Sequence, residues 1–191
     1  MVARAEAAAA TAERILDAAT EVFWELPTDQ ISLDEVARRA GVTVQTVIRR
    51  FGGREGLLAA GVQREAEKVQ AQREAPVGDA ARAVHVLIDH YEAFGDRVLK
   101  MLAEEDRIPR IRTIADGGRA LHREWCERVF APALSKMRPG TRDRRLAQLV
   151  AVCDVYTWKL LRRQAGLSRR QTEVAVFELV NPLLSPFMAG A

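Results

Sequence analysis

The sequence predicts an all-helical protein, with a small N-terminal domain followed by a larger C-terminal one. Apolar residues recur at spacings of three and four along most of the chain, which is the pattern of helices that bury one face. No sustained alternation of apolar and polar residues, which would indicate strands, is present. Glycine- and proline-containing turns divide the pattern into segments of helical length, and 191 residues are enough for both domains.

Composition excludes several classes of protein. Apolar residues make up 48% of the chain and charged residues 29%, as in ordinary globular proteins. No run approaches the roughly 18 apolar residues of a membrane-spanning helix, and Arg4 and Glu6 interrupt the Ala-rich start, so we expect neither a membrane partner nor a signal peptide. Cys126 and Cys153 are too few and too far apart for a disulfide framework or a thiolate zinc site. A cytoplasmic location is expected.

The first two helices have recognisable ends. The first should cover about residues 10–25 and end at Leu26-Pro27, because the residue before a proline is pushed out of the α region. Ser32 and Glu35 have the spacing of a capping box, in which each side chain accepts the other residue's backbone N–H. A second helix should therefore begin at Leu33, and Gly41 is suited to ending it in a left-handed conformation.

The next two helices follow closely. Thr43 is placed to cap a third helix over residues 44–50, and Gly52-Gly53 should end it. A fourth helix is expected over residues 54–74, closed by Pro76 and Gly78. Beyond it we expect four helices and a short segment, over 79–105, 108–118, 119–137, 141–165 and 168–184.

The distribution of charge indicates a possible partner. The formal net charge is only +3, but residues 36–54 contain no acidic residue and five arginines: Arg38, Arg39, Arg49, Arg50 and Arg54. A surface that faces phosphates needs such a local concentration of cations. Most charge runs are simply solvated faces, so this observation requires a matching structural motif.

Residues 32–51 supply that motif, a helix, a tight glycine turn and a second helix. Small Ala37 allows close approach of the two helices, and Val36, Ala40, Val47 and Phe51 should pack with the first helix. The residues of the third helix that this core does not need are Thr43, Val44, Gln45, Thr46, Arg49 and Arg50. Arginine pairs with guanine and glutamine with adenine in the major groove, while Thr43 and Arg54 suit phosphates.

These residues also resemble a known family. Phe23, Ser32-Leu33-x-x-Val36-Ala37-x-x-Ala40-Gly41-Val42-Thr43, Val47-x-x-x-Phe51 and Arg54-Glu55-x-Leu57-Leu58 resemble the TetR-family DNA-binding domain over about residues 10–60. The resemblance implies a DNA-binding domain over 1–54, a connecting helix over 55–78 and a ligand-binding and dimerisation domain over 79–191. It implies base-reading positions at Gln45, Thr46 and Arg49, and backbone-contact positions at Thr43, Arg50 and Arg54.

The function implied is that of a ligand-responsive transcriptional regulator. Such a homodimer would bind double-stranded DNA at a palindromic operator, and a small-molecule effector would release it; repression rather than activation is a family-level expectation. The chain departs from the family at Ile48, where most members have a tyrosine that commonly touches a phosphate, at Arg50, often a histidine, and at Gly53, often a capping Ser or Thr.

The C-terminal half offers candidates for the effector and the partner subunit. A pocket is expected among residues that combine aromatic surface with polar groups: His90, Tyr91, Phe94, Met101, Trp125, Phe130, Asp154 and Trp158. Apolar stripes on the last two helices are expected to form the dimer interface by resemblance: Leu149, Cys153, Tyr156, Val176, Val180 and Leu183. In both sets, ordinary core packing is the alternative interpretation.

An enzyme and a helical adaptor are the two alternative classes of protein. None of the three histidines follows a glutamate by three residues, as in di-iron bundles, and no hydrolase or phosphate-loop motif occurs, so we expect no enzyme, no cofactor and no metal site. A helical adaptor that binds protein or an anionic membrane through its basic face remains an alternative.

Overall fold

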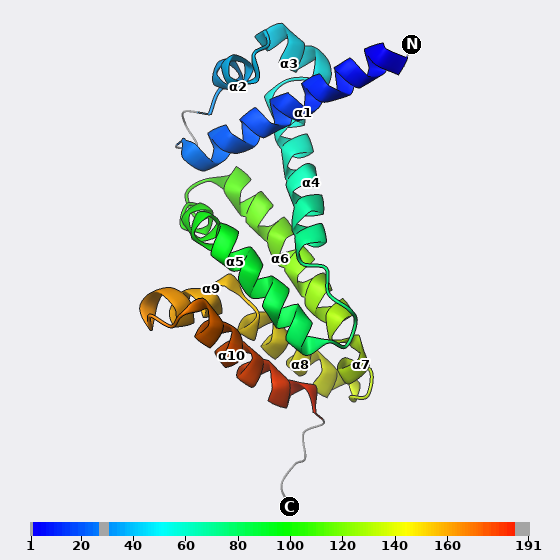
Figure 1. Ribbon diagram of the computed structural model, residues 1–191, viewed down its shortest axis with the longest axis vertical. Coiled ribbons are helices and arrows are strands. Elements are labelled where there is room, and N and C mark those ends of the chain that lie inside the picture. Colours follow the sequence, from blue (N-terminus) through cyan, green and yellow to red (C-terminus); the bar gives the residue numbers. More distant parts are fainter. Residues whose placement is uncertain (1, 27–30, 186–191) are drawn as a thin grey trace, which may run out of the picture. The chain divides into compact units, whose positions relative to one another are not determined.

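The computed structural model describes residues 2–26 and 31–185, and within these ranges the chain forms helices and turns without strands (Figure 1). It divides into two compact units, Met1–Glu67 and Lys68–Ala191. No helix among the described residues is both long enough and apolar enough to cross a membrane. The all-helical fold predicted from the sequence is confirmed.

The N-terminal unit contains α1 (Val2–Glu25), α2 (Leu33–Ala40), α3 (Val44–Phe51) and the first part of α4 (Arg54–Gln72). Pro27, expected to end the first helix, lies outside the described residues. Side chains of all four helices form one apolar core: Ile15, Leu16, Ala18, Val22, Val36, Ala37, Ala40, Val47 and Leu57. Phe51 packs against this core, as expected.

Arg64 ties α4 to α1 within this unit. Its Nη1 lies 2.8 Å from Asp17 Oδ1 and 3.3 Å from Glu13 Oε2, and its Nη2 donates to Thr20 Oγ1 at 3.1 Å. The arginine side chain is only 12% exposed although its carboxylate partners are solvated. The middle of α4 is thereby fixed to α1, the helix that supports the turn motif.

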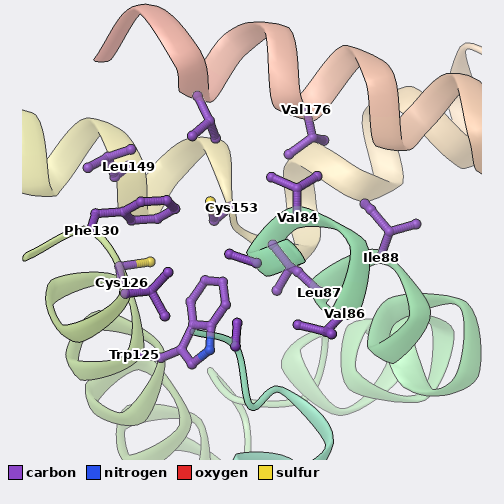
Figure 2. Close-up of a cluster of buried hydrophobic side chains, with 14 of the residues drawn as sticks. Val84, Val86, Leu87, Ile88, Trp125, Cys126, Phe130, Leu149, Cys153 and Val176 are labelled. Carbon is purple, nitrogen blue, oxygen red and sulfur yellow. The ribbon is translucent and has the colours of Figure 1, made fainter. Parts of the chain in front are cut away.

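The C-terminal unit is a bundle in which α5 (Ala80–Leu102) packs against α6 (Pro109–Val129), α9 (Val155–Trp158) and α10 (Arg169–Val180), and α6 also packs against α8 (Pro139–Val152) (Figure 1). The short helix α7 (Ala131–Leu134), a π-helical segment (Lys159–Gln164) and a 3-10 turn (Asn181–Leu184) complete it. Figure 2 shows α5, α6, α8 and α10 contributing to one apolar core, which includes Val84, Leu87, Phe130, Leu149 and Val176.

One expected helix end is wrong. Gly117-Gly118 was expected to end a short segment, but α6 runs through both glycines from Pro109 to Val129. Both glycines are exposed, and buried Ile111, Ala115 and His122 anchor the helix on either side. A helical glycine costs only about 1 kcal/mol, which this burial outweighs.

A second expected helix, over 141–165, is instead broken at Cys153 and Asp154. Asp154 caps α9, since its carboxylate accepts the N–H of Tyr156 at 2.9 Å. The break frees carbonyl groups of α8, and side chains bind them: Tyr91 Oη donates to Cys153 O at 2.9 Å and Thr157 Oγ1 to Ala151 O at 2.7 Å. These tertiary bonds offset the interrupted helix.

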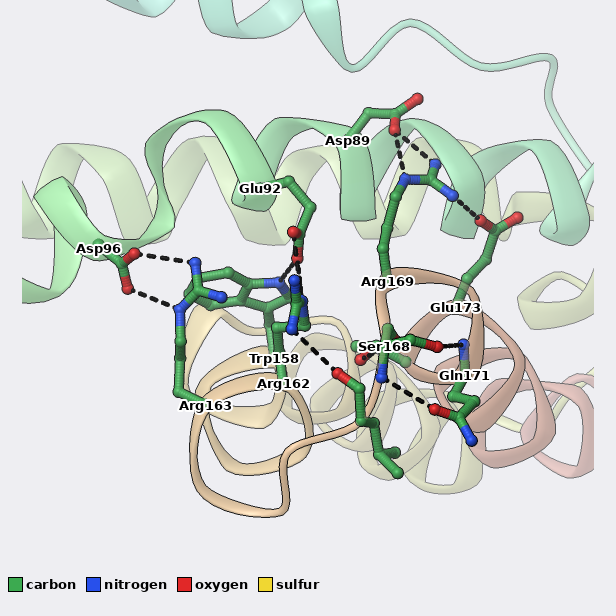
Figure 3. Close-up of polar contacts among 12 residues, drawn as sticks. Asp89, Glu92, Asp96, Trp158, Arg162, Arg163, Ser168, Arg169, Gln171 and Glu173 are labelled. Atoms are coloured by element: carbon green, nitrogen blue, oxygen red, sulfur yellow. Dashed lines mark hydrogen bonds and ion pairs between the residues drawn. The ribbon is translucent and has the colours of Figure 1, made fainter.

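Ion pairs hold α5 against the chain that follows α9 (Figure 3). Glu92 Oε1 accepts from both Trp158 Nε1 and Arg162 Nε, each at 2.9 Å, and Asp96 accepts from Arg163 through Nε and Nη2. Three cations of this arginine-rich region, Arg162, Arg163 and Arg169, are thus paired with acids of α5.

Candidate functional site

The turn between α2 and α3 is a tight, fully bonded helix end. Gly41 adopts φ 64°, a left-handed conformation that favours glycine. Its N–H donates to Arg38 O at 3.3 Å, and the N–H of Val42 donates to Ala37 O at 3.0 Å. This Schellman pattern satisfies the carbonyls at the end of α2 and fixes the direction in which α3 leaves.

The start of α3 is fixed in the same way. Thr43 Oγ1 accepts the N–H of Thr46 at 3.2 Å, and the two threonine hydroxyls lie 3.0 Å apart, so the predicted cap at Thr43 is confirmed. Ser32 likewise accepts the N–H of Glu35, at 3.2 Å. Of the capping box expected there, the described contacts show this half alone, since the Glu35 carboxylate binds arginines instead.

The arginines of this unit fall into two groups. Glu35 accepts from Arg38 at 2.6 and 2.8 Å and from Arg39 at 2.7 Å, and Arg39 also donates to Glu25 at 2.6 Å. Hydrogen bonds from Arg38 and Arg39 lower the pKa of Glu35 to about 2, so this carboxylate stays ionised at neutral pH. Two of the five arginines between residues 36 and 54 are therefore neutralised within the chain.

The other three arginines are available to a partner. Arg49, Arg50 and Arg54 are exposed and form no ion pair with any other described residue. Gln45 is exposed too, one helical turn before Arg49, whereas Val47 is fully buried beneath them. Among the remaining candidates, Thr43 is exposed, while Val44 and Thr46 are half-buried.

Ile48 joins this outward face, which the sequence analysis missed. Its side chain is 38% exposed, and it lies three residues after Gln45 and beside Arg49 on an eight-residue helix. An apolar group in that position can contact the methyl group of thymine. Its position, where most family members have a tyrosine that commonly touches a phosphate, was the signal in the sequence that this side chain faces outward.

Most candidate pocket residues lie inside the C-terminal unit. Tyr91, Trp125, Phe130 and Trp158 are at most 5% exposed and belong to its apolar core. The remaining candidates are buried His90 and half-buried Phe94, Met101 and Asp154. His90, Tyr91 and Trp125 gather near a residue that sequence reasoning missed, buried Arg73. An arginine at the end of an amphipathic helix gives no signal that it is buried.

The candidate dimer interface needs correction. Side chains with at most 2% exposure cannot form a contact surface, and four candidates are in that state, packed in the protomer's own core: Leu149, Cys153, Val176 and Val180. Leu183 is half-buried against the same core. The large apolar side chains that are exposed on these helices, here called the C-terminal apolar surface, are Tyr156, Leu160, Val174 and Leu179, between 47% and 56% exposed.

The geometry defines a class of protein: a helical protein with an N-terminal helix-turn-helix domain and a separate C-terminal bundle. Residues 15–60, which contain the turn motif, match the family model described as bacterial regulatory proteins of the tetR family. This match covers the helix-turn-helix region, 46 of the 191 residues.

Two curated proteins are similar to part of the chain. Uncharacterized HTH-type transcriptional regulators from two strains of Mycobacterium tuberculosis are 32% identical over 77 residues, 40% of this chain and 38% of theirs. The chain therefore matches well under half the length of these curated relatives.

Solved structures extend the similarity of fold to nearly the whole chain. A transcriptional regulator from Rhodococcus sp. RHA1 has a TM-score of 0.63 at 22% identity, covering 91% of this chain and 95% of its own. A putative TetR-family regulator from Rhodococcus sp. has a TM-score of 0.66 at 15% identity, covering 92% and 99%. At these identities the comparison shows the fold alone.

Proposed function

We propose that this protein is a sequence-specific DNA-binding transcriptional regulator. Two copies bind a palindromic operator, with α3 of each in successive major grooves about 34 Å apart. A small molecule held by the C-terminal unit favours one arrangement of its helices and so shifts the population away from the DNA-bound form. A coupling of roughly 1–3 kcal/mol would lower operator affinity about 5- to 150-fold.

One observation carries the proposal: the outward face of α3 combines base-reading side chains with uncompensated positive charge. Gln45, Ile48 and Arg49 lie together on a helix that is capped at both ends and anchored by buried Val47. Arg38 and Arg39 on α2 are paired with Glu35, whereas the arginines at the end of α3 and the start of α4 are not paired with any described residue. Unpaired cations beside base-reading side chains are the pattern expected of a surface that binds DNA.

Selection of genomic fragments by the purified protein tests the proposal. We expect recovery of fragments that share one palindrome, with an affinity for that site that falls steeply as salt rises. Equal binding to random duplexes, or stronger binding to anionic vesicles than to any duplex, would favour the adaptor instead.

Arg49→Ala is expected to relax sequence preference. Because Arg49 points outward from the middle of the exposed face, its loss should remove about 1–3 kcal/mol of discrimination at one base pair of each half-site. Titration of single-base operator variants measures this effect. Arg38→Ala is the matched control, since Arg38 belongs to the same motif but is paired with Glu35; unchanged relative affinities in the Arg49 variant would contradict the assigned role.

Arg54→Ala should act differently. Arg54 opens α4 beside the end of α3, where a cation meets phosphate rather than base edges. We expect weaker binding to all duplexes by a similar factor and a salt slope reduced by about one. A loss confined to one operator base pair would show that Arg54 reads sequence instead.

A further inference from the structure

The C-terminal unit contains a buried cation without a carboxylate. Arg73, the residue after α4, is only 6% exposed and forms no ion pair with any other described residue. Its one side-chain hydrogen bond within the described chain joins Nη2 to His122 Nδ1 at 2.9 Å. Its Nε is buried and has no hydrogen-bond partner among the described residues.

His122 does not neutralise this charge. Its Nε2 lies 3.1 Å from the carbonyl oxygen of Val150, which can only accept, so Nε2 carries the hydrogen. In the neutral ring Nδ1 is then the acceptor for the Nη2 N–H of Arg73. The arginine is thus held by a neutral acceptor, although arginine remains ionised in proteins.

The other neighbours are aromatic or neutral. The guanidinium carbon lies 4.4 Å from the ring centre of Trp125 and 6.0 Å from that of Tyr91, and Trp125 Nε1 donates to Arg73 O at 2.7 Å. Burial, with the positive charge of Arg73 adding to it, lowers the pKa of His90 to about 4, so His90 is uncharged at neutral pH. Ring faces stabilise a buried cation only partly.

We infer that Arg73 is the anchor of the effector site and that the effector is an organic carboxylate with an apolar body. Arginine binds carboxylates through Nε and Nη2, as Arg163 binds Asp96 in this same protein at 3.1 and 2.9 Å. At Arg73 the Nε is free for that bond, and Trp125 and Tyr91 provide apolar surface beside it. The inference deepens the proposed function, on which its regulatory part rests.

One group of the chain, the thiol of Cys126, competes with a bound carboxylate for the positive charge of Arg73. Cys126 Sγ lies 3.9 Å from His122 Nε2, and a hydrogen bond from Cys153, with His122 adding, lowers the pKa of the Cys126 thiol. A thiolate there would partly neutralise Arg73 without any ligand. The experiment therefore includes a variant without that thiol.

Thermal unfolding of the full chain without DNA tests the site directly. Acetate, octanoate and benzoate serve as probes, with benzamide as the uncharged counterpart of benzoate. We expect at least one carboxylate to raise Tm, by about 5–10 °C at a hundredfold excess over its Kd, and benzamide to have no effect. Failure of all three carboxylates, or an equal shift with benzamide, would overturn the inference.

Variants locate the effect. Arg73→Gln should weaken carboxylate binding roughly 30-fold or more, whereas Arg163→Gln should not, although Arg163 also lies over a tryptophan ring, 4.6 Å from that of Trp158. Arg73→Met keeps the bulk without the charge, and we expect its Tm to equal or exceed that of the parent. Two outcomes would overturn the inference: a large loss of Tm in both Arg73 variants, or carboxylate binding only in Cys126→Ser. Either would show that a group of the protein itself neutralises the charge of Arg73.

A second measurement separates this inference from the proposed function. The active carboxylate is added to the protein bound to its selected operator. Carboxylate binding that lowers operator affinity supports both; carboxylate binding that leaves operator affinity unchanged supports the anion site and contradicts effector control. Operator binding by a protein that binds no carboxylate overturns the anion site alone.

Discussion

Tyr156→Asp is expected to convert a dimer into monomers and to weaken operator binding about 100-fold or more. The tyrosine is 47% exposed at the start of α9, and an aspartate there would place a charge within the C-terminal apolar surface. Two DNA-binding domains joined in one dimer bind an operator roughly 10²–10⁴ times more tightly than one. Loss of the dimer removes that factor without any change in α3.

The surface itself supports this expectation. The π-helical segment that carries Leu160 packs against α10, which carries Val174 and Leu179, so exposed apolar side chains occur on neighbouring elements. Single exposed apolar residues are unremarkable, so the effect of a charge at Tyr156 on assembly decides whether these residues belong to an interaction surface.

Sedimentation velocity and operator titration measure the two effects of Tyr156→Asp. Val77→Asp is the matched control, because Val77 is 57% exposed but lies in the turn between α4 and α5. A Tyr156 variant that remains dimeric would show that the partner binds elsewhere.

Gly95→Ala is expected to destabilise the C-terminal unit by about 1–3 kcal/mol, since it forces a methyl group into a filled space. The added Cβ would lie 2.5 Å from Cζ3 of Trp158, and 2.8 and 2.9 Å from two further ring atoms. The indole cannot easily move, because it is 1% exposed and its Nε1 donates to Glu92. The overlap therefore outweighs the higher helix propensity of alanine.

Thermal unfolding should register this loss as a Tm lower by about 2–10 °C. Gly117→Ala supplies the control, since that glycine is also helical but no atom lies within 4 Å of its added Cβ. We expect the control to gain up to about 1 kcal/mol. A Gly95 variant as stable as the Gly117 variant would mean that α5 and α9 can separate at little cost.

The helix ends of the N-terminal unit could be predicted because residues close to them in the sequence determine them. Ser32, Gly41, Thr43 and Gly52 each cap the helix that the sequence assigned to them, within the neighbouring few residues. Their side chains or left-handed backbone act on adjacent peptide groups, so no distant contact has to be known.

The C-terminal unit was less predictable because distant contacts decide its details. The break at Asp154 depends on Tyr91, 62 residues away from the carbonyl it binds. Apolar periodicity shows that Leu149 and Val176 are buried but not whether by their own chain or by a second one. The charge of Arg73 is likewise buried by aromatic residues that lie far along the chain.

The pairing of Glu35 with Arg38 and Arg39 has a consequence for the energetics of recognition. A dimer with three available arginines in each copy would displace roughly five condensed counterions from a duplex, whereas five in each would displace about nine. The pairing thus removes much of the favourable entropy of counterion release, which would be the same for any DNA sequence. Under the proposed function, its preference among sequences then comes from the few side chains that touch base edges.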